Sequence, residues 1–355
     1  MKDNILARHF PAPDFLDVPY VGIDISPMNV RMMEIIDSTT LEVGSYAEVS
    51  LSKPFIITDT DNTEVKEILK KWKKEYKLEY IKASLPEEKA YLFDTEVEYG
   101  NEAKMRSAIE FSLEENVPLS GTDVIFDYRL VGESPKKDFI KVAVTVLPCD
   151  VVTAYSELFH QCDLKPISYL IEAQASSRAL IKRGDRSTYI VVNINTARTG
   201  IFVVSGGAVQ FTSTIPIGST DFTKAIADKL SVDEAQAEML KETRGFVRGE
   251  DGIVLGALMN TAQLFVQEID KVYVYWNKHR ASIDPSVAVQ KVLISGKDGV
   301  MPGFKEYLGQ MLKMSVEVGN VWSNLSSFEK NLPPIVLSQA LNFGAAIGLA
   351  LPENE

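Results

Sequence analysis

Two stretches of the chain share one pattern of apolar and polar positions. In each, an apolar run ends in polar residues around an isoleucine, and a second apolar run follows after a few small or polar residues. The copies span residues 20–35 and 189–204. Apolar β runs joined by a short polar segment predict a β-hairpin with a polar tip. Two such hairpins half a chain apart predict a duplicated α/β domain whose tips face each other across a cleft.

The segments after each hairpin complete the pattern of an α/β unit. In the first half we expect strands over 20–25, 30–36, 41–49 and 80–85, a helix over 64–77, and a later return through residues 165–181. In the second half we expect strands over 189–193, 200–204, 208–217, 291–295 and 315–318, and helices from about 219, over 232–241, 252–280 and 303–312. The apolar stretch 335–351, rich in Ala and Gly, predicts a buried C-terminal helix.

Residues 87–164 interrupt this plan. A helix over 103–115, strands over 124–130 and 139–147, and a helix over 150–162 predict an α-β-β-α insert with its own core. The expected units are an arm (1–18), a first subdomain (19–86, completed by 165–184 and 334–352), the insert (87–164), a second-half subdomain (185–225, completed by 289–333) and a helical subdomain (226–288).

Composition narrows the class of protein. A chain of 355 residues fits two domains, and its net charge of −12 argues against a nucleic-acid-binding face. The two cysteines and three histidines lack ligand spacing, which disfavours a zinc site or a disulfide framework and fits a reducing cytoplasm. The N-terminus does not read as a signal peptide, and the stretch 335–351 is shorter than a bilayer requires. We therefore expect a soluble protein that reaches membranes only through partners.

Further motifs accompany the hairpins, namely a Gly218 turn into a helix and the segments 234–241 and 292–304. Together they resemble the actin-like ATPase superfamily, and the chain is most similar to the PilM family of type IV pilus assembly proteins, which is related to the division protein FtsA. The insert matches in position and order the extra subdomain that FtsA and PilM share, and residues 162–173 add support. The resemblance implies duplicated actin-like (ribonuclease H-like) α/β domains with an inserted α+β subdomain.

The resemblance also implies a site for ATP and Mg²⁺ at the first tip. Asp24 and Ser26 match the first phosphate-binding hairpin, and Asp24 would meet the metal through water. Asn29 and Arg31 would lie near the phosphates.

The second tip departs from the family pattern. Asn193, Asn195 and Thr196 match it, but an acid is usual at position 193 and a glycine at 195. A neutral amide should weaken metal binding, and a side chain at 195 is expected to crowd the γ-phosphate. The same two asparagines also suit caps of the hairpin. The nucleotide site is therefore expected to be partly degenerate.

Four further residues belong to the implied site. Gly296 matches the adenosine-side turn, and Gly218 forms a turn into a helix after the second hairpin, although both glycines also suit relief of steric strain. Lys297 stands where a small residue is usual, and Lys241 fits a helix residue near adenosine or a solvated lysine equally.

The function implied by the resemblance is that of a cytoplasmic scaffold. It would bind the tail of a PilN-like inner-membrane protein in a groove between the first subdomain and the insert, with PilO- and PilP-like proteins and the pilus motor as indirect partners. It would thus be peripheral to the inner membrane, and self-association stays open. The alternatives are a competent ATPase or kinase, a filament-forming protein like FtsA, and the equivalent component of a type II secretion or competence system.

Overall fold

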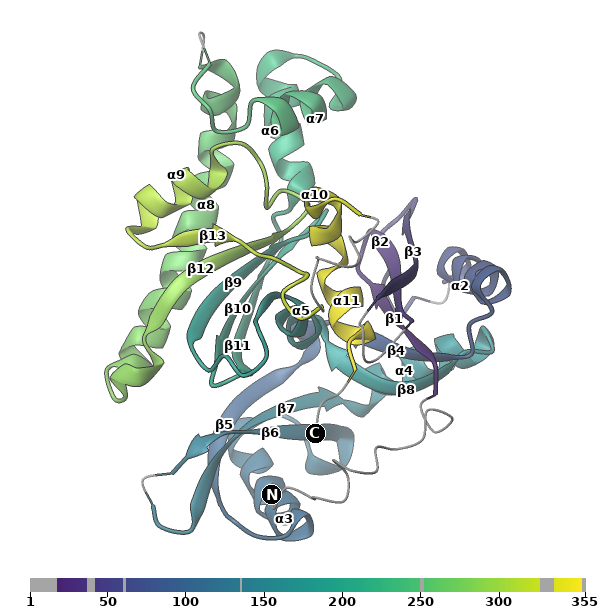
Figure 1. Ribbon diagram of the computed structural model, residues 1–355, viewed down its shortest axis with the longest axis vertical. Coiled ribbons are helices and arrows are strands. Elements are labelled where there is room, and N and C mark those ends of the chain that lie inside the picture. Colours follow the sequence, from purple (N-terminus) through teal and green to yellow (C-terminus); the bar gives the residue numbers. More distant parts are fainter. Residues whose placement is uncertain are drawn as a thin grey trace.

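Two five-stranded mixed sheets with the same strand order form the two halves of the molecule (Figure 1). The computed structural model describes residues 18–36, 42–59, 62–134, 136–249, 252–325 and 335–352, and all structural statements concern these residues. Most of the predicted arm, at residues 1–17, and position 41 of a predicted strand lie outside them.

The first sheet runs in the order β3-β2-β1-β4-β8. Its strands are β1 (Tyr20–Ile25), β2 (Asn29–Ile35), β3 (Val43–Ser50), β4 (Tyr80–Leu85) and β8 (Lys165–Ile171). The first three strands form an antiparallel meander, and β4 and β8 continue the sheet parallel to β1. The helices of this half are α2 (Thr63–Tyr76), α4 (Cys149–Gln161) and α5 (Glu172–Leu180).

The second sheet repeats this plan in the order β11-β10-β9-β12-β13. Its strands are β9 (Thr188–Ile194), β10 (Thr199–Ser205), β11 (Ala208–Ile215), β12 (Val289–Gly296) and β13 (Val316–Val318). Its helices are α6 (Ser219–Leu230), α7 (Glu234–Thr243), α8 (Ile253–Trp276) and α9 (Phe304–Leu312). Again a meander is extended by two parallel strands. The predicted duplication is therefore confirmed.

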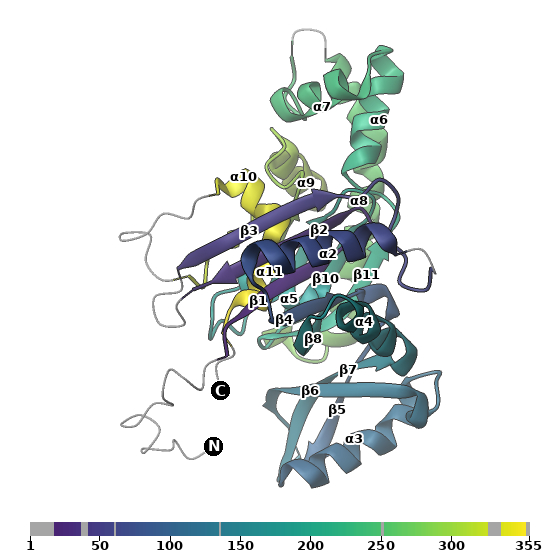
Figure 2. The ribbon, with the colours of Figure 1, turned by 90° about the vertical axis from the view of Figure 1, so that its right-hand side faces the viewer.

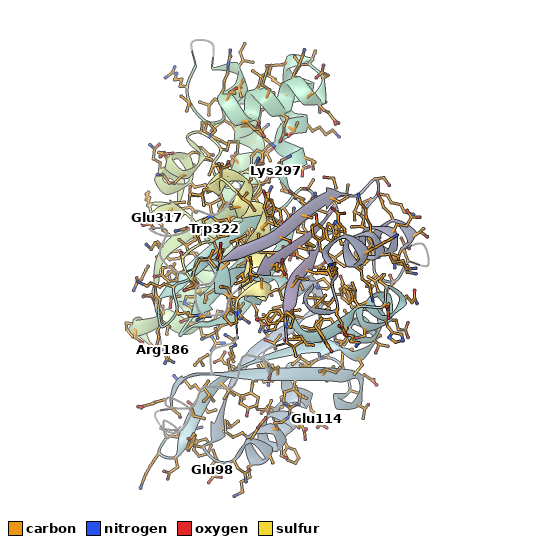
Figure 3. The ribbon with its side chains drawn as sticks, turned by 45° about the vertical axis from the view of Figure 1, so that its right-hand side comes forward. Glu98, Glu114, Arg186, Lys297, Glu317 and Trp322 are labelled. Atoms are coloured by element: carbon orange, nitrogen blue, oxygen red, sulfur yellow. The ribbon has the colours of Figure 1, made fainter. Side chains whose placement is uncertain are left out.

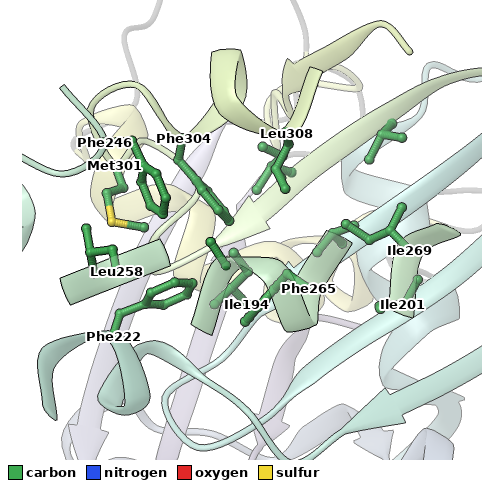
Figure 4. Packing of buried hydrophobic residues seen from close by; sticks show 14 of the residues in the cluster. Ile194, Ile201, Phe222, Phe246, Leu258, Phe265, Ile269, Met301, Phe304 and Leu308 are labelled. Atoms are coloured by element: carbon green, nitrogen blue, oxygen red, sulfur yellow. The ribbon is translucent and has the colours of Figure 1, made fainter. Parts of the chain in front are cut away.

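Separate apolar cores stabilise the two halves. In the second half, rings from α6, α8 and α9 pack with Phe246 over the sheet (Figure 4). The Phe222 and Phe265 ring centroids lie 5.1 Å apart, and those of Phe246 and Phe304 lie 5.0 Å apart, which are favourable aromatic separations. The helix expected over 252–280 thus contributes Phe265 to this core.

Helix α5 and the C-terminal helix α11 (Gly344–Ala350) lie between the halves (Figure 1). A third cluster of buried residues includes members from both sheets and from these helices. The backbones approach so closely that a Cβ at Gly348 would lie 1.7 Å from the Ala175 carbonyl oxygen. The predicted single C-terminal helix is wrong in one respect: α10 (Leu337–Ala340) and α11 are separated by a 3-10 turn at Leu341–Phe343.

The insert differs from its prediction in element order. Strand β5 (Tyr91–Glu98) was not predicted, and it joins β6 (Val124–Glu133) and β7 (Phe139–Pro148) in a sheet of order β5-β7-β6, covered by α3 (Glu102–Asn116). Helix α4, predicted as part of the insert's α-β-β-α order, packs on the core of the first half instead. Figure 2 shows the insert as a separate layer beside the first sheet. The subdomain boundaries stay a prediction.

No helix in the described part of the chain is both long and apolar enough to cross a membrane.

Candidate nucleotide site between the hairpin tips

Both tips lie at the carboxyl ends of parallel strands, where α/β sheets commonly place ligands. The β1–β2 tip carries Asp24, which is buried. Its carboxylate accepts hydrogen bonds from the Ser84 hydroxyl at 2.7 Å and from Arg31 Nη1 at 3.3 Å. Arg31 also pairs with Glu48, at 2.8 Å. The first tip is thus an acid held by neighbours from two adjacent strands.

A hydrogen bond joins the two tips directly. The Thr196 hydroxyl donates to Asn29 Oδ1 at 2.7 Å, and Asn29 Nδ2 donates to the Ser50 hydroxyl at 3.0 Å. Ser26 closes its own turn, because its hydroxyl donates to the Asn29 carbonyl at 3.1 Å. The predicted facing of the tips is therefore present in the structure, and their polar side chains bond to each other.

The second tip is organised around Glu172, the first residue of α5. Its Oε1 accepts from Asn193 Nδ2 at 3.1 Å and from Asn195 Nδ2 at 2.6 Å, and its Oε2 accepts from Arg198 Nη2 at 2.8 Å. The other side of the Arg198 guanidinium donates to Glu88. Both asparagine amides therefore donate to a carboxylate, a role that an aspartate at either position could not fill when ionised.

The centre of the site is crowded with buried carboxyl groups. Burial, together with the charge of Glu172, raises the pKa of Asp24 to about 6. The same two causes raise the pKa of Glu87 well above its ordinary range, and Glu87 Oε2 has no partner among the described residues. Although burial lowers it, the charges of Glu172 and Glu88 raise the pKa of Arg198. The site thus favours protonation of Asp24 and Glu87.

The adenosine side contains a buried lysine. Lys241 on α7 is fully buried, and its Nζ donates to the Ser219 and Thr223 hydroxyls at 2.7 and 2.9 Å. It also pairs with Glu238 at 2.9 Å and Asp298 at 3.1 Å. The solvated-lysine alternative is therefore wrong for Lys241.

Two glycines permit close approaches beside this lysine. A Cβ at Gly218 would lie 2.5 Å from the Thr196 carbonyl oxygen, and one at Gly296 would lie 2.1 Å from that of Ile194. Gly296 also has a φ of +84°, which favours glycine. Lys297 pairs with Glu238 at 2.8 Å. Steric relief is thus a sufficient reason for both glycines.

A cavity of about 410 Å³ opens beside Lys241 and Lys297. Lys297 marks this end of the molecule in Figure 3. Two buried acceptor atoms of its lining residues, Asp298 Oδ2 and Asn342 Oδ1, have no hydrogen-bond partner among the described residues. The cavity volume is within the range that holds a nucleoside.

Sequence reasoning missed the acids and the arginine at the centre of the site. Glu172 follows β8 and Glu87 follows β4, while the predicted Asp24 is the next-to-last residue of β1; these strands are parallel neighbours. An acid near the carboxyl end of each of three parallel strands is a signal that the sequence itself contains. Arg198 immediately precedes β10, in the same tip as the predicted Asn195, and its pairing with Glu172 could be seen only in three dimensions.

A family model described as "Type IV pilus assembly protein PilM" matches residues 22–354. The chain belongs to the PilM family. It is thus an actin-like protein of type IV pilus assembly, as the resemblance implied. A search of curated proteins finds no match to this PilM-family chain.

Solved structures agree on the fold. A chain of a PilM–PilN type IV pilus biogenesis complex is 17% identical, with a TM-score of 0.75 over 94% of this chain and 98% of that one. The ethanolamine utilization protein EutJ from Carboxydothermus hydrogenoformans is 16% identical, with a TM-score of 0.56 over 96% and 91%. MreB5 of Spiroplasma citri bound to AMPPNP is 10% identical, with a TM-score of 0.52 over 93% and 94%. These likenesses show the duplicated actin-like fold.

The residues of this PilM-family chain fit the two ends of a nucleotide unequally. At the cavity, the volume of about 410 Å³ suits a nucleoside, although Lys241 Nζ is already engaged by four partners. At the tips, the donors that a phosphate would need are engaged by Glu172. In the described part of the chain, no group of three or more His, Cys, Asp or Glu side chains is arranged to hold a metal ion. A phosphate at the tips would have to compete with Glu172 for these three donors.

Proposed function

We propose that this chain is a scaffold of type IV pilus assembly that binds an extended tail of a PilN-like inner-membrane protein. The observation that carries the proposal is membership of the PilM family together with a match over nearly all of a chain from a PilM–PilN complex. Such binding would hold the chain at the inner membrane through its partner. PilO- and PilP-like platform proteins and the motor would then be indirect partners.

The place proposed for the tail is where the first sheet meets the insert. Strand β8 forms one edge of the first sheet and β6 one edge of the insert's sheet. Both views of the ribbon place these sheets side by side (Figures 1 and 2). Ile167 on β8 is 46% exposed and Ile125 on β6 is 49% exposed. A free strand edge offers backbone hydrogen bonds to an extended peptide, and apolar side chains beside it supply affinity.

Peptide binding tests this part of the proposal. A synthetic tail of a PilN-like protein, labelled with a fluorophore, should bind the full chain, and Ile167→Asp or Ile125→Asp should weaken binding at least tenfold. Phe111→Asp is the matched control, because Phe111 is 82% exposed on α3 of the insert, away from both edges. Failure of the unmodified chain to bind would refute the adaptor role. Equal weakening by all three substitutions would refute the proposed place.

We further propose that the nucleotide cleft between the hairpin tips is partly degenerate. It binds the nucleoside part of a nucleotide, and the phosphates add little to the affinity. The support is that Glu172 already engages Asn193, Asn195 and Arg198. A phosphate entering there would have to displace a buried carboxylate or lie beside it, and like charges at that distance repel. The scaffold role then needs no turnover of ATP.

A ligand series tests the cleft separately from the peptide. Calorimetric titrations with adenosine, AMP and Mg-ATP should give dissociation constants within about tenfold of one another, since each tenfold step is about 1.4 kcal/mol. Mg-ATP binding a hundredfold tighter than adenosine would contradict the closed phosphate end. Robust ATP hydrolysis that Asp24→Ala abolishes would refute the scaffold-only role, independently of the result of the peptide-binding assay.

A further inference from the structure

A second pocket lies at the junction of the insert, helix α5 and the second half. Its volume is about 390 Å³. Its walls come from β6, the end of α5, the linker after α5, the β10–β11 turn and the C-terminal residues. Among the lining residues are Arg129, Arg178, Lys182, Arg183, Asp185 and Pro352. We call this the junction pocket.

The junction pocket is separate from the cavity beside Lys297. Figure 3 shows Arg186, which follows the pocket's lining segment, beside the insert, whereas Lys297 lies toward the far end of the second half. Arg186 ties the linker to the insert, because its Nη2 donates to the Val131 carbonyl at 2.9 Å. Residues 182–185 therefore form one wall of the pocket, and Arg186 holds them against the insert.

Positive charge gathers at this pocket although the chain carries a net charge of −12. Arg129, Arg178, Lys182 and Arg183 line it, and Asp185 is the one acid among the lining residues that the structure describes. The Asp185 carboxylate is itself engaged, accepting from the Tyr189 hydroxyl at 2.6 Å and from the Ser187 N–H at 2.9 Å. The pocket is thus a local cationic region on an acidic protein.

Two of the guanidinium groups donate to backbone carbonyls. Arg178 Nη2 donates to the carbonyls of Leu351 and Pro352 at 2.7 and 3.1 Å, and Arg183 Nη2 donates to the Pro352 carbonyl at 2.9 Å. These hydrogen bonds fix the orientation of the two guanidinium groups. Fixed guanidinium groups match the oxygen pairs of phosphate groups well.

We propose that the junction pocket binds a small soluble polyanion that carries phosphate groups. Its volume is within the usual range for small-molecule sites. A ligand there would contact the insert, the helix between the halves and the second half at once, so its binding would depend on how these parts are arranged. This site is independent of the proposed tail and of the cleft.

Titration with pyrophosphate tests the proposal on the full chain. Binding should be measurable by calorimetry, and Arg129→Glu or Lys182→Glu should weaken it at least tenfold, since both residues are exposed and their replacement leaves the cores intact. Lys229→Glu is the control, because it makes the same charge change at an exposed position on α6, remote from the pocket. It should leave the affinity within twofold.

Four results would overturn the proposal. The first is that pyrophosphate does not bind at millimolar concentration. The second is that Lys229→Glu weakens binding as much as Arg129→Glu does, which would indicate general charge attraction. The third is that Glu172→Gln changes the affinity and Arg129→Glu does not, which would indicate binding at the hairpin tips. The fourth is Arg129-dependent binding to phosphatidylglycerol vesicles without binding of pyrophosphate, which would indicate that the ligand is a membrane surface.

Discussion

The two hairpin tips have the same backbone plan but opposite chemistry. At the first tip an acid, Asp24, is held by a hydroxyl and by Arg31. At the second tip, amides and Arg198 surround an acid that comes from elsewhere, Glu172. The two halves share one strand order, but the side chains at their tips contact different groups. A fold can therefore keep the geometry of a nucleotide cleft while its side chains satisfy one another.

The arginines of the two tips should contribute unequally to stability. Arg198→Met leaves Glu172 buried without its cation, and loss of one partner of a buried pair costs about 3–5 kcal/mol. Arg31→Met should cost less, about 2 kcal/mol, because Asp24 keeps its Ser84 hydrogen bond and Glu48 is partly exposed. Urea unfolding at pH 7 compares them. Equal losses would contradict the difference between the tips.

Asp24, at the first tip, should make the free energy of unfolding depend on pH. The folded pKa of Asp24 is about 6 against an ordinary 3.8, so the folded state binds this proton more tightly than the unfolded state. Asp24 therefore opposes folding above pH 6, and its cost fades as the pH falls toward 4. The whole shift corresponds to about 3 kcal/mol.

Asp24→Asn lacks this titration. Its free energy of unfolding relative to the unmodified chain should therefore rise between pH 4 and pH 7, by up to about 3 kcal/mol. Unfolding curves at several pH values measure it, with Glu114→Gln as the control for loss of an exposed carboxyl on α3. Parallel stability profiles for Asp24→Asn and the unmodified chain would show that Asp24 does not titrate as described.

The sequence predicted the hairpins and both sheets because each depends on local alternation, which survives in one dimension. Strand β5 was missed although Tyr91, Phe93 and Val97 alternate toward the insert's core. The bond from Thr196 to Asn29 depends on how closely the halves approach, which no local pattern encodes. The role of Glu172 likewise needed two sheets to be brought together.

Restoring the family's usual acid at the second tip should be unfavourable in isolation. In the unmodified chain, Asn193 Nδ2 donates to Glu172 Oε1 at 3.1 Å. Asn193→Asp replaces this donor with a carboxylate oxygen, so the hydrogen bond is lost and the two negative charges repel each other. We expect a loss of about 2 kcal/mol at pH 8. Millimolar Mg²⁺ should recover part of it, because a divalent ion favours paired carboxylates.

The double variant Asn193→Asp with Glu172→Gln isolates this repulsion. The loss caused by Asn193→Asp should largely disappear in the Glu172→Gln background, as a double-mutant cycle measures. An unchanged loss in that background would mean that Glu172 is not the group the new acid meets.

The smallest expected effect concerns the contact between the tips. Thr196→Val removes the hydroxyl that donates to Asn29, and a single hydrogen bond of this kind contributes about 1 kcal/mol. Thr220→Val is the matched control, since its hydroxyl donates to the Thr196 carbonyl within the second half at 2.9 Å. Amide exchange should separate the two. Ser26 lies in the first tip, opposite Thr196, and its N–H donates to the Asn29 carbonyl at 2.9 Å. Only Thr196→Val should speed amide exchange at Ser26. If Thr220→Val speeds exchange at Ser26 equally, the tips are held together by the packing of the halves and not by their own hydrogen bond.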